Sequence, residues 1–253
     1  MANRTVSKQP RPKATPLVEA SSAPDTERAS KADIHQRIYT AIVEHRLQPG
    51  TKLIEERIAE LFNVSRTQVR GVLQRLAVEQ LVTLVHNRGA FVSQPSAAEA
   101  HDVLDVRRTM EPGAVARLIE RIAAGKANTA VRQLRQLVKR EQKALATGDR
   151  RTAVRLSGEF HVLLAELSGS GIYLRMMREL TPLTCLAILR FEAPTAAACP
   201  NDEHAHLIDA IEAQDVALAG RLMADHLHHI EQALELNRSD VEPEVDLAEL
   251  LLG

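Results

Sequence analysis

The sequence of 253 residues contains no Trp and has only four Phe, two Tyr and two Cys. The few aromatic residues are scattered, which is unlike a stacking platform for single-stranded nucleic acid. Cys185 and Cys199 lack the spacing of metal ligands or of a redox pair, as expected in a reducing cytoplasm. No apolar run approaches the roughly 18 to 20 residues that a membrane span needs, and the polar, basic start has no signal-peptide segment. We therefore expect a cytoplasmic protein without a membrane partner.

The net charge of −1 is unevenly distributed along the chain. Residues 1–95 contain 14 Lys and Arg against nine Asp and Glu, a net charge of +5, and the remaining residues have a net charge of −6. This asymmetry is compatible with an N-terminal half that contacts phosphate groups. The hydrophobic fraction of 45% is typical of a globular protein with a substantial core, and the length suggests two modest domains.

Composition and periodicity divide the chain into four segments. Residues 1–30 mix Pro, Ser, Ala and charges without periodicity and are expected to be disordered. Residues 31–95 predict a winged helix-turn-helix of three helices and a β-hairpin, and residues 96–238 an antiparallel all-helical bundle. Residues 239–253 form an acidic tail. The expected fold is therefore mostly α.

The individual elements follow from apolar spacing and turn residues. Ile34, Ile38, Ile42 and Leu47 recur at helical spacing, and Gln48-Pro49-Gly50 ends that segment. A β-hairpin is expected from Leu81 to Val92, with a basic, Gly-containing tip. The helices of the second domain are expected near 97–124, 128–147, 149–168, 172–192, 201–213 and 215–236.

Residues 55–76 have the residue types that a helix-turn-helix needs. Ala59 is small enough for the point where two helices cross, and Asn63 tolerates the positive φ of a tight turn. Ser65 is a favourable N-cap for a second helix, whose first turn carries Arg66, Thr67 and Arg70. The N-terminal end of a recognition helix enters the major groove, where arginine can pair with guanine. Alternatively, such arginines only solvate a surface helix.

These motifs resemble the DNA-binding domain of the GntR family of regulators. The resemblance covers residues 33–95 and rests on LQPGTKL, on IAELFNVSRTQVRGVLQRLAVEQLV and on NRGAFV. The family usually has Pro-x-Arg-Glu where this chain has Gln-Val-Arg-Gly at 68–71. The resemblance implies that the following residues contact DNA: Arg57, Ser65, Arg66, Thr67, Arg70, Arg88 and Gly89.

Three histidines of the second domain lie on apolar helix faces. His161, His204 and His226 each share a stripe with Leu, Ile or Met residues, whereas His206 and His228 point away. His204 lies 11 residues before Asp215, a plausible N-cap at a turn, and His226 lies 11 residues after it. Equal distances from the turn between antiparallel helices place both rings at one level. Such rings either hydrogen-bond to neighbours in the core or bind a divalent transition metal, with zinc as the expected ion.

Residues 97–236 resemble the FCD effector domain of the FadR subfamily of GntR regulators. The resemblance rests on VRRTME at 106–111, EFH at 159–161 and EHAHLIDAIEAQDVALAGRLMADHL at 203–227. In that family a metal is often held by three histidines and by an aspartate one helical turn before the first of them. The resemblance implies metal ligation by His161, His204 and His226, with Ser157 at the aspartate position. The family also often has Asn where this chain has Ser170.

Arg107 falls on the inner face of its helix, with Val103 and Met110. A buried arginine needs a partner because an unpaired buried charge is unfavourable. Glu111, one turn further along the helix, is one candidate. The carboxylate of a bound effector beside the metal is the other, and the family resemblance favours it.

Together these patterns predict a transcription regulator and not an enzyme, and the family resemblance implies that it is a repressor. Two copies of the chain would bind a pseudo-palindromic operator in double-stranded DNA, and a small organic acid in the helical domain would control that binding. One alternative is a metal-dependent phosphohydrolase of the HD type, but that type needs His-Asp and the chain has Asp225-His226. The other alternative is a nucleoid-binding structural protein, which would not need a histidine-lined pocket.

Overall fold

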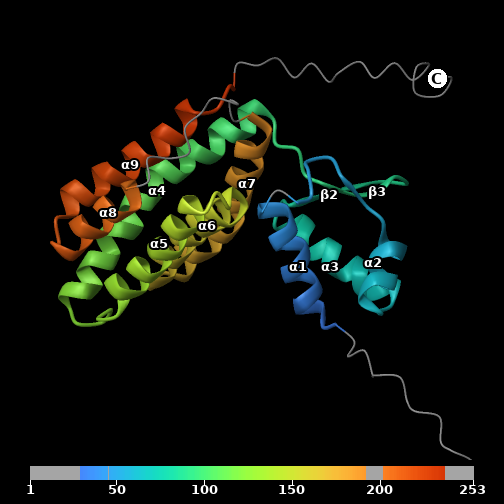
Figure 1. The fold of residues 1–253 in the computed structure, drawn as a ribbon, viewed down its shortest axis with the longest axis horizontal. Coiled ribbons are helices and arrows are strands. Elements are labelled where there is room, and N and C mark those ends of the chain that lie inside the picture. The colour runs from blue at the N-terminus through green and yellow to red at the C-terminus, as the bar shows by residue number, and fades with distance from the viewer. Residues whose placement is uncertain (1–28, 45, 192–201, 237–253) are drawn as a thin grey trace, which may run out of the picture.

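The computed structural model describes residues 29–44, 46–191 and 202–236. Two groups of elements lie next to each other (Figure 1), each with a hydrophobic core. We call α1 to β3 the N-terminal unit and α4 to α9 the helical bundle. The N-terminal unit consists of α1 (Lys31–Val43), β1 (Lys52–Leu53), α2 (Glu55–Phe62), α3 (Arg66–Val78), β2 (Val82–Val85) and β3 (Gly89–Val92). The bundle consists of α4 (Ala97–Ala123), α5 (Ala130–Ala146), α6 (Arg150–Leu167), α7 (Gly171–Phe191), α8 (Glu203–Glu212) and α9 (Val216–Gln232).

The turn between α2 and α3 has the conformation that the sequence predicts. Asn63 adopts the left-handed conformation with φ 51° and ψ 48° and ends α2. Ser65 caps α3 with a reciprocal pair of hydrogen bonds to Gln68, which is a capping box. Ala59 is buried where the two helices meet, and Val69 is fully buried on α3. The predicted helix-turn-helix is confirmed.

A three-stranded antiparallel sheet completes the N-terminal unit, in the order β1-β3-β2. The hairpin pairs Val82 with Val92 and Val85 with Gly89, and the predicted β-hairpin is confirmed. The sequence analysis missed β1, because a strand of two residues shows no periodicity. The first helix also differs from the prediction: α1 ends at Val43, and Leu47 lies in the following turn while still packing against the core.

The bundle helices agree with the predicted ranges to within a few residues. Side chains at the expected turns cap them: Ser96 caps α4, Asp149 caps α6 and Asp215 caps α9. In Figure 1, α9 lies along α4 and α6 lies between α5 and α7. The predicted fold class, mostly α with a winged helix-turn-helix and a helical bundle, is confirmed.

Helices α6 and α7 of the bundle also contact α1 of the N-terminal unit. Leu186 on α7 is fully buried and belongs to the core of the N-terminal unit, not to that of the bundle. Arg155 on α6 donates to the carboxylate of Glu44, just after α1, at 2.7 Å. The bundle is therefore attached to the N-terminal unit by side chains as well as by the chain connection at Ser93–Ser96.

Two predicted segments lie almost wholly outside the described residues. The acidic tail at 239–253 is outside them, and so are Cys199 and residues 1–28 of the expected disordered tail. Ser30, which the prediction assigned to that tail, caps α1 through a capping box with Asp33. None of the described helices is long and apolar enough to cross a membrane.

The turn at Asn63 provides a test of the helix-turn-helix. A β-branched side chain is strained in the left-handed conformation, by about 1–2 kcal/mol. We expect Asn63→Val to lower the free energy of unfolding by about that amount, as measured by urea denaturation. Asn63→Gly is the matched control, because glycine adopts this conformation freely, and it should change stability by only a few tenths of a kcal/mol. A Val variant as stable as the Gly variant would contradict the assigned turn.

Candidate functional site

The first turn of α3 presents polar and basic side chains to solvent. Ser65 accepts a hydrogen bond from the backbone N–H of Gln68 at 3.3 Å and so opens the helix. Thr67 is exposed. The side chains of Arg66 and Arg70 are 62% and 60% exposed. The described residues place this turn on the surface, where a DNA duplex can reach it.

Arg70 has a partner that the sequence analysis did not identify. Its Nε and Nη2 donate to the two carboxylate oxygens of Glu55, at 3.0 and 2.9 Å. These hydrogen bonds hold the pKa of Glu55 below its usual range. An exposed ion pair contributes at most about 1 kcal/mol, so the contact with Glu55 is weak enough for Arg70 to exchange it for another partner.

The hairpin of β2 and β3 forms the wing of the winged helix-turn-helix. More positive charge lies at this wing than the sequence pattern indicated. Arg88 and Gly89 lie exposed at the tip, and Arg57 is exposed on α2. The guanidinium carbon of Arg88 and the Nζ of Lys52 each lie 5.8 Å from the centre of the Phe91 ring. Lys52 reaches the wing because β1 pairs with β3, and the sequence analysis missed that strand.

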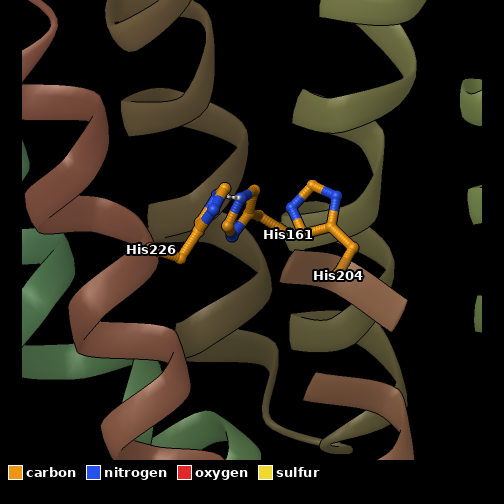
Figure 2. A group of neighbouring side chains, drawn as sticks. All are labelled: His161, His204 and His226. Carbon is orange, nitrogen blue, oxygen red and sulfur yellow. Dashed lines mark hydrogen bonds between the residues drawn. The ribbon is translucent and has the colours of Figure 1, made fainter. Parts of the chain in front are cut away.

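Three histidines from different helices meet inside the bundle (Figure 2). His161 comes from α6, His204 from α8 and His226 from α9. All three are buried, and one possible ligand atom from each lies within 4.8 Å of the others. The ring centres of His204 and His226 are 4.6 Å apart, which confirms that the two rings lie at one level. His206 and His228 are exposed, as predicted, and so is His229.

Each of the three imidazoles has a glutamate against its Nδ1 atom. The pairs are His161 with Glu111 at 2.6 Å, His204 with Glu141 at 3.0 Å, and His226 with Glu203 at 2.6 Å. An ionised carboxylate can only accept a hydrogen bond, so the Nδ1 atoms carry the protons. The Nε2 atoms of the neutral rings therefore carry lone pairs.

These Nε2 lone pairs face one another in a buried space. Nε2 of His161 lies 3.2 Å from Nε2 of His226 (Figure 2), and Nε2 of His204 has no hydrogen-bond partner among the described residues. Burial lowers the pKa of His161 to about 4 and that of His226 to about 3, so neither ring gains a second proton at neutral pH. The dashed contact in Figure 2 is a hydrogen bond only where one of these two Nε2 atoms carries a proton; with both protons on Nδ1, the two lone pairs repel each other unless a cation lies between them.

The three Nε2 atoms fit a divalent transition metal. Zinc binds histidine nitrogen at about 2.0–2.1 Å, so two ligands of a tetrahedral ion are about 3.3 Å apart, close to the 3.2 Å between His161 and His226. Carboxylates on the outer ring nitrogens are the usual second shell of such sites, because they orient the ring and raise its basicity. Ser157, one turn before His161 on α6, lines the adjoining cavity with a neutral hydroxyl. Three protein ligands leave a coordination position for a further oxygen.

A cavity of about 130 Å³ adjoins the histidines and is lined by residues of all six bundle helices. Arg107, which is 1% exposed, lines it from α4. Its Nε donates to Glu111 at 2.6 Å and its Nη1 donates to the hydroxyl of Thr184 at 2.9 Å. Burial raises the pKa of Glu111, but Arg107 and His161 outweigh this effect and lower it to about 2. Glu111 is thus an intramolecular partner of Arg107. The third guanidinium nitrogen, Nη2, has no hydrogen-bond partner among the described residues.

Three buried side-chain atoms of the described residues lack a hydrogen-bond partner, and all three belong to residues that line this cavity. They are Nη2 of Arg107, Oγ1 of Thr181 and Nε2 of His204. Buried polar groups are nearly always satisfied, so unsatisfied ones in one cavity indicate a ligand site.

Sequence reasoning missed Glu141, Glu203, Thr181 and Thr184. Glu141 could have been found, because it lies on the same apolar face of α5 as Leu134 and Val138. Glu203 precedes His204 in the chain but binds His226, and such a cross-helix pair leaves no signal in a helical repeat. The threonines gave no signal, because a hydroxyl in an apolar helix usually bonds to its own backbone.

Comparison with known proteins gives matches to two family models. Residues 30–92 match the model of bacterial regulatory proteins of the gntR family, and residues 102–229 match the FCD domain. A regulator of the helix-turn-helix type from an unstable DNA locus of Streptomyces ambofaciens is 29% identical over 84% of this chain and 88% of its own. The transcriptional repressor RspR of Escherichia coli K12 is 25% identical over 82% of this chain and 91% of its own. A GntR regulator from Rhodococcus sp. RHA1 has a similar fold, with a TM-score of 0.69, 23% identity, and coverage of 80% of this chain and 95% of its own.

The histidine geometry predicts the effect of removing one ring. Loss of an outer-shell partner of a metal ligand weakens binding by about 10–100-fold, and loss of a ligand itself costs more. We expect His204→Ala to bind zinc at least about 100-fold more weakly than the wild type and to lose any stabilisation by added zinc. Zinc titration and thermal unfolding with and without zinc measure both effects.

The matched control is His206→Ala, on the same helix but exposed. It should bind zinc as the wild type does. If the wild-type protein contains no divalent metal and gains no stability from zinc, the metal assignment is wrong.

Proposed function

The chain belongs to the gntR family of bacterial regulatory proteins and carries an FCD domain, and we propose that a small organic acid, bound beside a zinc ion in the bundle, controls its binding to an operator. It is a DNA-binding transcription regulator and not an enzyme, in agreement with the expectation from the sequence. A relative is named a repressor, and we propose the same role here, with repression relieved by the acid. We also propose that the protein acts in the cytoplasm.

The exposed N-terminal turn of α3 supports the assignment of DNA contacts. In helix-turn-helix proteins this end of the recognition helix reaches the base edges in the major groove. Arg66, Thr67 and Arg70 are exposed there, and we assign base contacts to them, while Ser65 fixes where the helix begins. Arg57, Lys52 on β1 and the wing residues Arg88 and Gly89 are assigned to the phosphate backbone or the neighbouring minor groove. Two chains, as a homodimer, would place two α3 helices in successive major grooves of a pseudo-palindromic operator.

The observation that carries the effector proposal is the set of unsatisfied atoms around one cavity. A metal ion held by His161, His204 and His226 would satisfy Nε2 of His204 and supply a Lewis acid for an oxygen of the ligand. The carboxylate of the acid would accept a hydrogen bond from Nη2 of Arg107, which already has its other nitrogens engaged. Arg107 can therefore have both of the partners considered from the sequence: it pairs with Glu111, and its Nη2 would remain as a donor for the carboxylate of a ligand.

Helices α6 and α7 provide a path from the cavity to the DNA-binding unit. On α7, Thr184 and Cys185 line the cavity, and the next residue, Leu186, is buried in the core of the N-terminal unit. On α6, Ser157 lines the cavity and Arg155 pairs with Glu44 after α1. A ligand that binds one placement of these helices better than another would shift the orientation of the recognition helices.

Arg70 provides the test of the DNA contacts. We expect Arg70→Ala to lower affinity for the operator, selected from random duplex DNA with the wild-type protein, by about tenfold or more through lost base or phosphate contacts. Arg75→Ala is the matched control, because Arg75 is 64% exposed at the other end of α3, where it pairs with Glu79. Equal affinity of a folded Arg70 variant and the wild type would contradict the assignment.

Arg107 provides the test of the acid site. A screen of small carboxylic acids by thermal shift in the presence of zinc should find acids that stabilise the wild-type protein. Arg107→Lys keeps a positive charge beside Glu111 but loses the spare donor, so binding of those acids should weaken by about tenfold or more. Operator affinity without acid should stay as in the wild type. An unchanged dose–response curve for operator release would show that Arg107 does not bind the acid.

A further inference from the structure

Thr181 on α7 has an unusual environment for a buried threonine. It is 3% exposed, and its Oγ1 has no hydrogen-bond partner among the described residues. A threonine within a helix usually donates to the carbonyl four residues earlier. Thr184 does so, donating to the carbonyl of Leu180 at 3.1 Å while it accepts from Arg107. The Thr181 hydroxyl therefore carries a penalty that Thr184 avoids.

Close packing of α6 against α7 holds the Thr181 side chain in place. Gly158 of α6 faces it, and a Cβ at position 158 would lie 2.9 Å from Cγ2 of Thr181. The methyl group of Thr181 thus fills the space that the glycine leaves. Both residues line the cavity beside the histidines. Thr181 is consequently a fixed part of the cavity wall.

The three unsatisfied groups of the cavity differ in what they require. Nη2 of Arg107 can only donate, the lone pair of His204 needs a cation, and the hydroxyl of Thr181 can both donate and accept. An acid whose only polar group is its carboxylate can bridge Arg107 and a metal ion, but its hydrocarbon part would leave Thr181 unsatisfied. A second oxygen on the ligand would give the Thr181 hydroxyl a hydrogen-bond partner, so that all three groups would be satisfied.

The size of the cavity limits the ligand. Its volume is about 130 Å³, and a cavity of about 150 Å³ accommodates benzene, which has six carbon atoms. The ligand that fits therefore has on the order of six non-hydrogen atoms. A carboxylate takes three of them, which leaves room for a short chain with one further oxygen.

We infer that Thr181 is a specificity-determining residue, and that the effector is a small carboxylic acid with an additional hydroxyl or carbonyl oxygen that bonds to it. This inference rests on the acid site proposed above. It adds one contact to those that Arg107 and a metal ion would make: with this contact, the cavity should discriminate against the analogue that lacks the second oxygen. A site built to bond a ligand hydroxyl rejects the analogue without it, because the buried group of the protein is then left unpaired.

The test uses the full-length, zinc-loaded protein and two matched pairs of acids: lactate with propionate, and 3-hydroxybutyrate with butyrate. Calorimetry gives the ratio of dissociation constants within each pair. We expect the wild-type protein to prefer the hydroxylated acid by about tenfold in at least one pair. Thr181→Val should reduce that preference to about twofold or less, without weakening the binding of the acid that lacks the hydroxyl. Thr181→Ser, which keeps the hydroxyl, should retain the preference.

Stability without ligand gives a second measurement. Because valine has nearly the same shape and no buried hydroxyl, Thr181→Val should unfold at the same temperature as the wild type or a higher one. A clear decrease would mean that the hydroxyl has a partner in the protein, and would overturn the inference.

The outcomes separate the inference from the proposed function. Binding of the acids without a preference, or a preference that Thr181→Val retains because the ligand hydroxyl bonds only to the metal, overturns the role of Thr181 and leaves the acid site standing. If none of the four acids binds the zinc-loaded wild-type protein at millimolar concentration, the acid site itself is wrong, and the role of Thr181 with it.

Discussion

The central interaction of the bundle is the pairing of each buried imidazole with a glutamate. Glu111, Glu141 and Glu203 come from α4, α5 and α8, and they bind rings on α6, α8 and α9. The pairs therefore link five helices at one level. They also fix the proton on the outer nitrogen of each ring, and this leaves three lone pairs directed toward one another. Such an arrangement is unfavourable without a cation, so the same contacts that position the rings create the affinity for a metal.

The acid site depends on the same network. Glu111 binds His161 through one carboxylate oxygen and Arg107 through the other, so the metal centre and the arginine share an anchor. Thr184 accepts a hydrogen bond from a second nitrogen of Arg107. Arg107 and Thr181 both line the same cavity, and Nη2 of Arg107 and the Thr181 hydroxyl have no hydrogen-bond partner among the described residues. Leu186, two residues beyond Thr184, packs into the other core. The chain thus connects the proposed ligand to the DNA-binding unit over one turn of α7.

Much of this structure could be predicted from the sequence, because its signals are local or periodic. Asn63 and Ser65 determine the turn through their own backbone preferences, and the 3.6-residue repeat identified the three inward histidines. The rest depends on contacts between distant elements. Strand β1 forms only because β3 pairs with it, Arg70 meets Glu55 across the helix pair, and Glu203 reaches past its neighbour to His226. Leu186 fits the apolar stripe of α7 equally well whichever core receives it.

The proton positions on the three rings can be measured directly. A long-range correlation spectrum of ¹H and ¹⁵N in zinc-free protein at neutral pH, assigned with single histidine variants, distinguishes the two nitrogens of each imidazole. We expect protonated Nδ1 and unprotonated Nε2 in His161, His204 and His226, and a shift of the Nε2 resonances when zinc is added. A proton on Nε2 in any of the three rings, or a ring that stays doubly protonated at neutral pH, would contradict the arrangement on which the proposed metal centre depends.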